Sequence, residues 1–278
     1  MTAATGHGAP SRAGPHLHLS PPAPFVFQPN RDAMTDTAAT LAPSATLPRS
    51  SLDLIGATPL VEVTHFDTGP CRLFLKLESQ NPGGSIKDRV ARSMIDAAEK
   101  EGLIKPGSTL VEATAGNTGL ALTLVGAQRG YKVVLVVPDK MSQEKIFALK
   151  ALGARVVMTR SDVGVGHPEY YQDMAQRLAS EIPGAWYVNQ FGNPNNPKAH
   201  ETGTGPEIWA QTGHDLDAVV VGVGSAGTLT GLTRFFQKET GLSFVAWRQQ
   251  ASLFACLPVP PATLLLLLCW GIGSFAIS

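Results

Sequence analysis

The sequence has few cysteines and no obvious metal-binding pattern. Its 278 residues contain three cysteines, Cys71, Cys256 and Cys269, which are widely separated and form no Cys-x-x-Cys pair. This spacing is typical of a reduced compartment and argues against a zinc site. The seven histidines form no His-Glu-x-x-His motif, and no acidic cluster lies near them. We therefore predict that the protein has no metal centre.

The sequence also lacks an excess of either charge and a long hydrophobic run. Lysine and arginine number 22, as do aspartate and glutamate, so the formal net charge is zero. Nucleic-acid binding requires a basic excess on some face, so we expect no nucleic-acid partner. The leucine-rich stretch at 264–270 is shorter than the roughly 20 residues of a membrane-spanning helix and has no basic flanks. We expect no membrane partner.

The two ends of the sequence differ from its middle. Residues 1–50 are rich in Ala, Pro, Ser and Thr, so we predict a disordered N-terminal extension. No hydrophobic run follows Met1, which argues against a secretory signal. We expect translation to start at Met34 and the protein to be cytoplasmic, rather than residues 1–33 to be an organelle address. At the other end we expect residues 246–278 to be an atypical apolar tail outside the fold, arising from a truncated or frame-shifted end.

Between Leu52 and about Gln237 the sequence alternates strand-like and helix-like segments. Apolar or alternating runs at 72–78, 108–113, 133–137, 155–159, 185–189 and 218–221 predict strands. Helical spacing follows at 90–98, 118–128, 144–152 and 170–180, and in a last helix that ends near Phe236. The alternation predicts an α/β fold in which helices cover a parallel sheet, with ligands bound at the carboxyl ends of the strands.

One lysine lies at an unusual junction. The segment 81–89, Asn-Pro-Gly-Gly-Ser-Ile-Lys-Asp-Arg, places Lys87 after a tight glycine turn and at the start of a helix. A lysine held near amide donors can lose its proton and attack a carbonyl group. The alternative is a solvated lysine in an ordinary Pro-Gly turn.

Two other junctions between a strand and a helix could bind an anion. The segment 114–119, Thr-Ala-Gly-Asn-Thr-Gly, offers amides and hydroxyls at a helix N-terminus, although Asn and Thr there could equally form an ordinary helix cap. The segment 222–227, Gly-Val-Gly-Ser-Ala-Gly, matches the dinucleotide fingerprint and so raises a nicotinamide-dependent oxidoreductase as an alternative. That fingerprint needs an acidic residue about 20 positions later, where 244–248 has none. No Gly-Lys-Ser/Thr follows, which argues against a P-loop for a nucleoside triphosphate. A single phosphate held by residues 224–228 fits better.

A ligand that suits all three loops has a carbonyl for the lysine, a phosphate for the glycine-rich turn and an amino-acid partner, as pyridoxal 5'-phosphate has. With Gln-Phe-Gly-Asn-Pro at 190–194 as a fourth motif, residues 51–245 resemble the cysteine synthase and cystathionine β-synthase family of fold-type-II pyridoxal-phosphate enzymes. The resemblance implies a two-domain fold like that of the tryptophan synthase β-subunit, with the second domain apparently truncated. We expect an N-terminal α/β domain at 51–194, the start of a C-terminal domain at 195–245, and a homodimer.

The resemblance also implies roles for individual residues. Lys87 would form the internal aldimine and later handle the α-proton of the substrate, and Asn117 would hydrogen-bond the ring hydroxyl of the cofactor. The implied phosphate ligands are Gly224, Ser225, Ala226, Gly227 and Thr228. The implied neighbours of the substrate carboxylate are Thr114, Ala115, Thr118 and Gln190.

The implied reaction is β-replacement in cysteine biosynthesis. O-acetylserine and sulfide would give cysteine and acetate; the alternatives are a cystathionine β-synthase, which uses serine and homocysteine, and an inactive truncated homologue or binding subunit. Two residues depart from the family pattern, because Ala115 replaces a common serine and Ala226 replaces a usual glycine. We expect the methyl group of Ala226 to be tolerated only at negative φ. No residue corresponds to the hydroxyl partner of the pyridine nitrogen. His167, His200 and His214 are expected at the surface or in loops.

Overall fold

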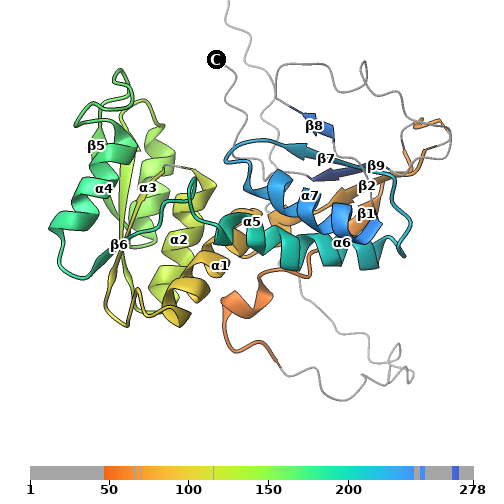
Figure 1. Ribbon diagram of the computed structural model, residues 1–278, viewed down its shortest axis with the longest axis horizontal. Helices are drawn as coiled ribbons and strands as arrows, with labels where there is room; N and C mark the ends of the chain where they lie inside the picture. The colour runs from red at the N-terminus through yellow and green to blue at the C-terminus, as the bar shows by residue number, and fades with distance from the viewer. Residues whose placement is uncertain are drawn as a thin grey trace, which may run out of the picture. The chain divides into compact units, whose positions relative to one another are not determined.

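The computed structural model describes residues 47–65, 67–69, 71–114 and 116–240, together with the backbone of 245–247 and 265–268. These residues form two sheets, each with its own covering helices (Figure 1). The four-stranded sheet has the order β5-β4-β3-β6, and the five-stranded sheet has the order β1-β2-β9-β7-β8. The predicted α/β class with a parallel sheet covered by helices is confirmed.

The four-stranded sheet is parallel throughout. It consists of β3 (Thr109–Ala113), β4 (Lys132–Pro138), β5 (Arg155–Thr159) and β6 (Ala185–Tyr187). In β4 the run from Val133 to Val137 is buried, which is typical of a strand covered on both faces. Each of these four strands was predicted to within two residues at either end, because each segment has the length and the apolar content of a strand.

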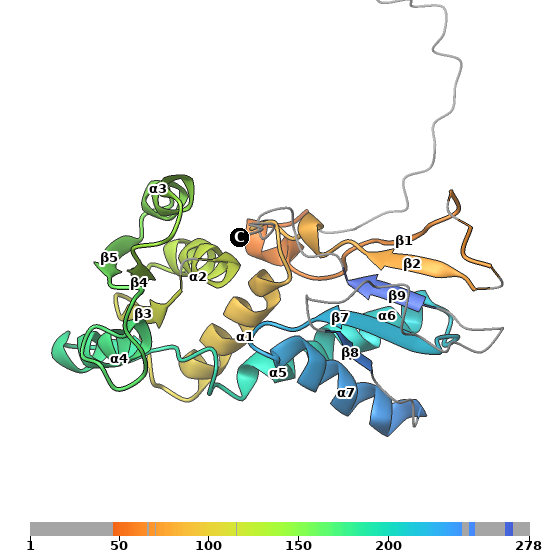
Figure 2. The ribbon, with the colours of Figure 1, turned by 90° about the horizontal axis from the view of Figure 1, so that it is seen from above.

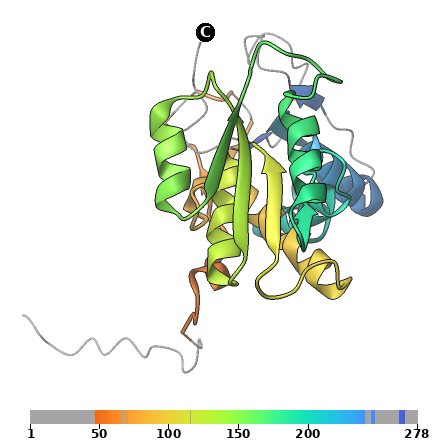
Figure 3. The same cartoon turned by 90° about the vertical axis from the view of Figure 1, so that its left-hand side faces the viewer.

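Helices cover both faces of this sheet (Figure 3). On one face α1 (Lys87–Lys100), α2 (Asn117–Gln128) and α3 (Gln143–Ala151) pack on side chains such as Leu110 and Leu135. On the other face α4 (Tyr171–Glu181) packs on Val111 and Val136. This alternation follows from the two-residue repeat of a strand, because successive side chains point to opposite faces of the sheet.

The five-stranded sheet carries the glycine-rich segment 222–227, which follows β7. It contains β1 (Leu60–Glu62), β2 (Leu73–Lys76), β7 (Ala218–Gly222), β8 (Val245–Trp247) and β9 (Leu265–Leu268), and only the pairing of β1 with β2 is antiparallel. The helices α6 (Gly205–Gln211) and α7 (Gly227–Thr240) pack on it. Their shared core contains Phe74, Ile208, Leu216, Val219, Val221, Leu232 and Phe236.

The placement of β9 differs from the expectation that residues 246–278 lie outside the fold. The backbone of β9 lies between β2 and β7, and Leu266 pairs with both Phe74 and Val219 (Figure 2). A run of leucines has no polar side chain to satisfy, so it can enter a sheet interior as a parallel strand. The remaining tail residues and residues 1–46 lie outside the described residues, and the proposed domain boundary at 194 stays a prediction.

A short helical segment links the two sheets in the chain. It consists of α5 (Asn195–Ala199) and the single π-helical turn η4 (His200–Thr204), which continues into α6. The 3-10 turns η2 (Ser51–Leu54) and η3 (Glu78–Gln80) precede α1. Within the described part of the chain, no helix combines the length and apolarity needed to cross a membrane.

Four charged side chains join the start of α1 to α6. Arg89 bonds Glu78 through Nε at 2.7 Å and Glu207 through Nη1 at 2.7 Å, and Lys76 Nζ lies 3.0 Å from Glu207 Oε2. Lys76, Glu78 and Arg89 are buried, and Glu207 is partly exposed. The two cations and two anions balance, which is the condition under which buried charges are tolerated.

Candidate active site

The turn before α1 fixes the position of Lys87. Gly84 has a φ of +79°, which favours glycine, and a side chain at Gly83 would put its Cβ 2.4 Å from Asp88 Oδ1. The Asp88 carboxylate accepts a hydrogen bond from the Gly83 amide at 2.5 Å, and burial raises its pKa to about 6. Lys87 is consequently the first residue of α1, as the sequence predicts.

Lys87 is buried and faces the second sheet's glycine-rich loop. Its side chain is 5% exposed, and Nζ donates to Ser225 Oγ at 3.1 Å. Burial disfavours the charged amine and lowers the pKa of Lys87 to about 8. A lysine of this pKa has a sizeable neutral, nucleophilic fraction near neutral pH. The alternative of a solvated lysine in a turn is therefore wrong.

The loop between β7 and α7 forms an anion cradle. A small pocket is lined by Lys87, by the predicted phosphate ligands at 224–228, and by their neighbours Gly222 and Leu229. The amides at the start of α7 have no partner within the helix, and the helix dipole favours an anion there. The hydroxyls of Ser225 and Thr228 add two donors. This donor set fits a phosphate group.

Ala226 differs from the expectation of a negative φ. Its φ is +60°, in the left-handed region, although it carries a methyl group. The methyl group is exposed, so it has room, and the Ala226 carbonyl accepts from the Thr230 amide at 2.9 Å in the first turn of α7. The loop therefore keeps the geometry that a glycine would adopt, at the cost of backbone strain.

The predicted carboxylate loop meets Gln190. Thr118 Oγ1 donates to Gln190 Oε1 at 2.7 Å, and both side chains are buried. Thr114 Oγ1 accepts from the Gly116 amide at 3.3 Å, and Asn117 is the half-buried first residue of α2. Ala115 lies outside the described residues. The loop thus makes a cap-like turn, and in addition it contacts a residue from a distant strand end.

Three buried polar residues near this site were not predicted. Glu112 Oε1 accepts from the Ala113 amide at 2.8 Å, and Oε2 accepts from the Gln190 amide at 3.0 Å. Burial raises the pKa of Glu112 to about 7. Asn196 donates to the Gln190 carbonyl at 2.8 Å. A carboxylate in the middle of an apolar strand was the available signal for Glu112; Asn196 had none.

His200 is the third, and its expected place at the surface or in a loop is wrong. The side chain is fully buried, with Nδ1 3.0 Å from Thr204 Oγ1 and Nε2 3.2 Å from Thr228 Oγ1. Burial, and then the positive charge of Lys87, lower the pKa of His200 to about 3. The imidazole is therefore neutral and can orient the hydroxyl of Thr228 beside the anion cradle.

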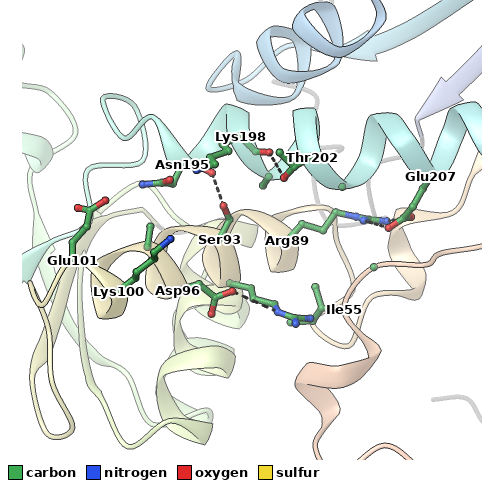
Figure 4. A pocket seen from close by; sticks show the side chains of 15 residues that line it. Ile55, Arg89, Ser93, Asp96, Lys100, Glu101, Asn195, Lys198, Thr202 and Glu207 are labelled. Carbon is green, nitrogen blue, oxygen red and sulfur yellow. Dashed lines mark hydrogen bonds and ion pairs between the residues drawn. The ribbon is translucent and has the colours of Figure 1, made fainter. Parts of the chain in front are cut away.

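A larger hollow of about 700 Å³ lies along α1, α5 and η4 (Figure 4). Its charged lining is largely paired within the protein: Arg89 bonds Glu207, and Asp96 bonds Arg129 at 2.6 Å. Ser93 Oγ donates to the Asn195 carbonyl at 2.8 Å across it. Lys87 and the anion cradle line the other pocket, so the candidate chemistry belongs there.

A buried, partly neutral lysine beside a helix-terminal anion cradle, in an α/β fold, defines a site for a phosphorylated carbonyl compound. The family model described as "Pyridoxal-phosphate dependent enzyme" matches residues 52–256. The chain belongs to this family of pyridoxal-phosphate dependent enzymes. The predicted family and its cofactor, pyridoxal phosphate, are thereby confirmed, and the dinucleotide alternative is set aside.

Individual relatives carry two names. Cysteine synthase B of Escherichia coli (strain K12) is 46% identical over 188 residues, 67% of this chain and 60% of that protein. Cystathionine beta-synthase of Dictyostelium discoideum is 46% identical over 184 residues, 66% of this chain and 37% of that protein. The solved structure of a hydrogen sulfide-producing enzyme from Fusobacterium nucleatum superposes with a TM-score of 0.66 at 38% identity, covering 72% of this chain and 64% of that one. The chain thus spans 37–60% of the length of these two curated relatives.

Proposed function

We propose that this chain carries the lysine and phosphate subsites of a β-replacement enzyme that makes cysteine and acetate from O-acetylserine and sulfide. The observation that carries the proposal is the 3.1 Å contact between Lys87 Nζ and Ser225 Oγ, which joins a buried amine to the anion cradle. The relatives named cysteine synthase support it. We further propose a homodimer, which the resemblance implies, and a cytoplasmic location.

Pyridoxal phosphate, when bound, supplies an electron sink that makes the α-proton of an amino acid acidic and allows a β-substituent to leave. The role of Lys87 is to hold the carbonyl end of the cofactor and to move one proton at Nζ. Its lowered pKa, about 8, suits both tasks, because the amine must be neutral to attack and must then carry a proton at an ordinary pH. Burial of Lys87 also keeps water away from that proton.

The cradle residues would hold the phosphate. Gly224, Ser225, Ala226 and Gly227 place backbone amides at the start of α7, and Thr228 adds a hydroxyl that His200 Nε2 contacts at 3.2 Å. A neutral His200 that donates from Nε2 leaves the Thr228 proton directed at an anion. Asn117, at the start of α2, would contact the ring hydroxyl.

The substrate carboxylate would bind at the start of α2. Thr114, Ala115, Thr118 and Gln190 are the proposed contacts. Since Gln190 Oε1 already accepts from Thr118, its amide hydrogens remain as the donors for a carboxylate. A carboxylate at a helix N-terminus is also favoured by the helix dipole.

A cystathionine β-synthase activity, with serine and homocysteine, is the second candidate. The relative of that name from Dictyostelium discoideum is as similar to this chain, at 46% identity, as the cysteine synthase from Escherichia coli. The two activities would use the residues discussed so far, and they differ in the amino-acid substrate, O-acetylserine or serine, and in the sulfur nucleophile, sulfide or homocysteine.

The test is to purify the 278-residue chain with pyridoxal phosphate, reduce it with borohydride and locate the modified residue by peptide mass spectrometry. We expect modification at Lys87, and then turnover with sulfide that exceeds turnover with homocysteine. Faster turnover with homocysteine would favour the second candidate. Modification at Lys87 without turnover would leave a binding subunit or inactive homologue, and no modification would refute the proposal.

A further inference from the structure

A chain of buried and partly buried hydrogen bonds connects the proposed substrate side of the site to Lys87. Glu112 accepts a hydrogen bond from the backbone amide of Gln190. Asn196 Nδ2 donates to the backbone carbonyl of Gln190 at 2.8 Å and to Ser225 Oγ at 3.2 Å. Ser225 Oγ also accepts from Lys87 Nζ at 3.1 Å. Asn196 is the only one of these residues that bonds both the Gln190 turn and the phosphate loop within the described part of the chain.

The orientation of the Asn196 amide is determined by its neighbours. The Gln190 carbonyl can only accept, so the NH₂ group of Asn196 must face it, and both amide hydrogens are then in use. The side chain is 1% exposed, and its Oδ1 has no hydrogen-bond partner among the residues that the structure describes. Oδ1 lies against Gly227, where an added Cβ would be only 2.1 Å away. The amide therefore fills a slot that glycine leaves at the start of α7.

The Ser225 hydroxyl accepts hydrogen bonds from two donors. Lys87 and Asn196 occupy both acceptor positions of its hydroxyl, which leaves the Ser225 proton for a third direction. Because Ser225 lines the small pocket of the phosphate loop, a ligand in that pocket could accept this proton. When Lys87 engages a carbonyl ligand and leaves Ser225, Asn196 remains as the fixed donor that keeps this hydroxyl in place.

We infer that Asn196 is a positioning residue that couples the Gln190 turn to the phosphate loop and, through Ser225, sets the geometry of Lys87. The inference rests on the proposed function for its ligand, but the coupling itself concerns residues of this chain. Asn196 does not line the pocket with Lys87, so it acts through Ser225 and Gln190 rather than on the substrate. Asn196 therefore determines how well Lys87 and the anion cradle bind one ligand together.

The first experiment measures the two loops without any ligand. Asn196→Ala removes the amide, and Asn196→Asp keeps its shape but replaces the donating nitrogen with an oxygen that repels the Gln190 carbonyl. Hydrogen exchange by mass spectrometry should show faster exchange in the peptides covering both 187–192 and 222–230. Ser93→Ala is the matched control, because it removes the 2.8 Å bond from α1 to the neighbouring Asn195 carbonyl and leaves both hydrogen bonds of the Asn196 amide unchanged (Figure 4).

The second experiment compares pyridoxal 5'-phosphate with pyridoxal, which lacks the phosphate, as ligands of the same chain. Loss of the Asn196 donor should weaken binding of pyridoxal 5'-phosphate by roughly fivefold to tenfold, as expected for one hydrogen bond, and binding of pyridoxal by less. Wild type that takes up neither compound would refute the proposed function, and the exchange data would still decide the coupling. Exchange in either loop that is unchanged in Asn196→Ala, or changed equally in Ser93→Ala, would overturn the inference.

Discussion

Glu112 gives the site a distinctive dependence on pH. Its side chain is 1% exposed, and burial raises its pKa from 4.5 to about 7, against the lowering effect of the backbone amides of Gln190 and Ala113. A carboxyl whose pKa is higher in the folded state favours folding when protonated. Its contribution is complete below pH 4.5 and is lost as the pH rises through about 7.

The size of the effect follows from the pKa difference. The change from 4.5 to about 7 corresponds to about 3 kcal/mol of folding stability, of which about 2 to 3 kcal/mol is lost between about pH 5 and about pH 8. Glu112→Gln is neutral at every pH and cannot show this loss. Its amide nitrogen would face a backbone amide, so the variant also loses about 1 to 3 kcal/mol at all pH values.

The assay is urea denaturation of wild type and Glu112→Gln at several pH values. We expect the stability advantage of wild type over the variant to shrink by about 2 to 3 kcal/mol from about pH 5 to about pH 8. Glu181→Gln, whose side chain is 58% exposed on α4, is the control and should give a curve parallel to that of wild type. Parallel curves for Glu112→Gln, within about 0.5 kcal/mol, would refute the buried-carboxylate argument.

Three further predictions concern the lysine and its loop. The rate at which Lys87 captures pyridoxal phosphate, measured by trapping with borohydride, should rise with pH, with a midpoint near the Lys87 pKa of about 8, because only the neutral amine attacks. A midpoint near 10.5 would contradict the burial argument, and Lys87→Ala should abolish capture. Gly227→Ala should lower the unfolding free energy by about 1 to 3 kcal/mol in urea denaturation and weaken pyridoxal-phosphate binding, since its methyl would overlap Asn196 Oδ1; unchanged stability would show that the slot has room. Ala226→Gly should raise the unfolding free energy by about 0.5 to 1 kcal/mol by relieving the positive φ, and a decrease would argue against the left-handed geometry.

The elements of the four-stranded sheet could be predicted because each carries its own local signal. The apolar run in β4 has the length expected of a strand buried on both faces, and Gly153, with a φ of +97°, follows the helical segment before β5 as its sequence position suggests. Lys87 was found in the same way, from the glycine turn that precedes it. Local chemistry thus accounted for the elements and for the loops between them.

The bonds that assemble the site could not be predicted, because they join residues far apart in the sequence. Gln190 and Glu112 are 78 positions apart, and Asn196 and Ser225 are 29 apart. No element was predicted for residues 195–204, and their helical segments α5 and η4 contact α1 and α7, which are distant in the sequence. The positive φ of Ala226 was not expected for a related reason. The expectation considered only the backbone preference of alanine, and not the hydrogen bond that the Ala226 carbonyl accepts in the first turn of α7.

The four-charge cluster of Lys76, Glu78, Arg89 and Glu207 restricts how this sequence can change over evolutionary time. Removing one member leaves an uncompensated charge inside the protein, which costs about 3 to 5 kcal/mol and is comparable to the whole stability of many domains. Single substitutions at these positions are therefore poor intermediates, whereas replacing the set together by apolar side chains is tolerable. Among homologous sequences we expect the four positions to vary jointly or not at all, and a family in which Arg89 alone varies freely would show that the cluster is dispensable.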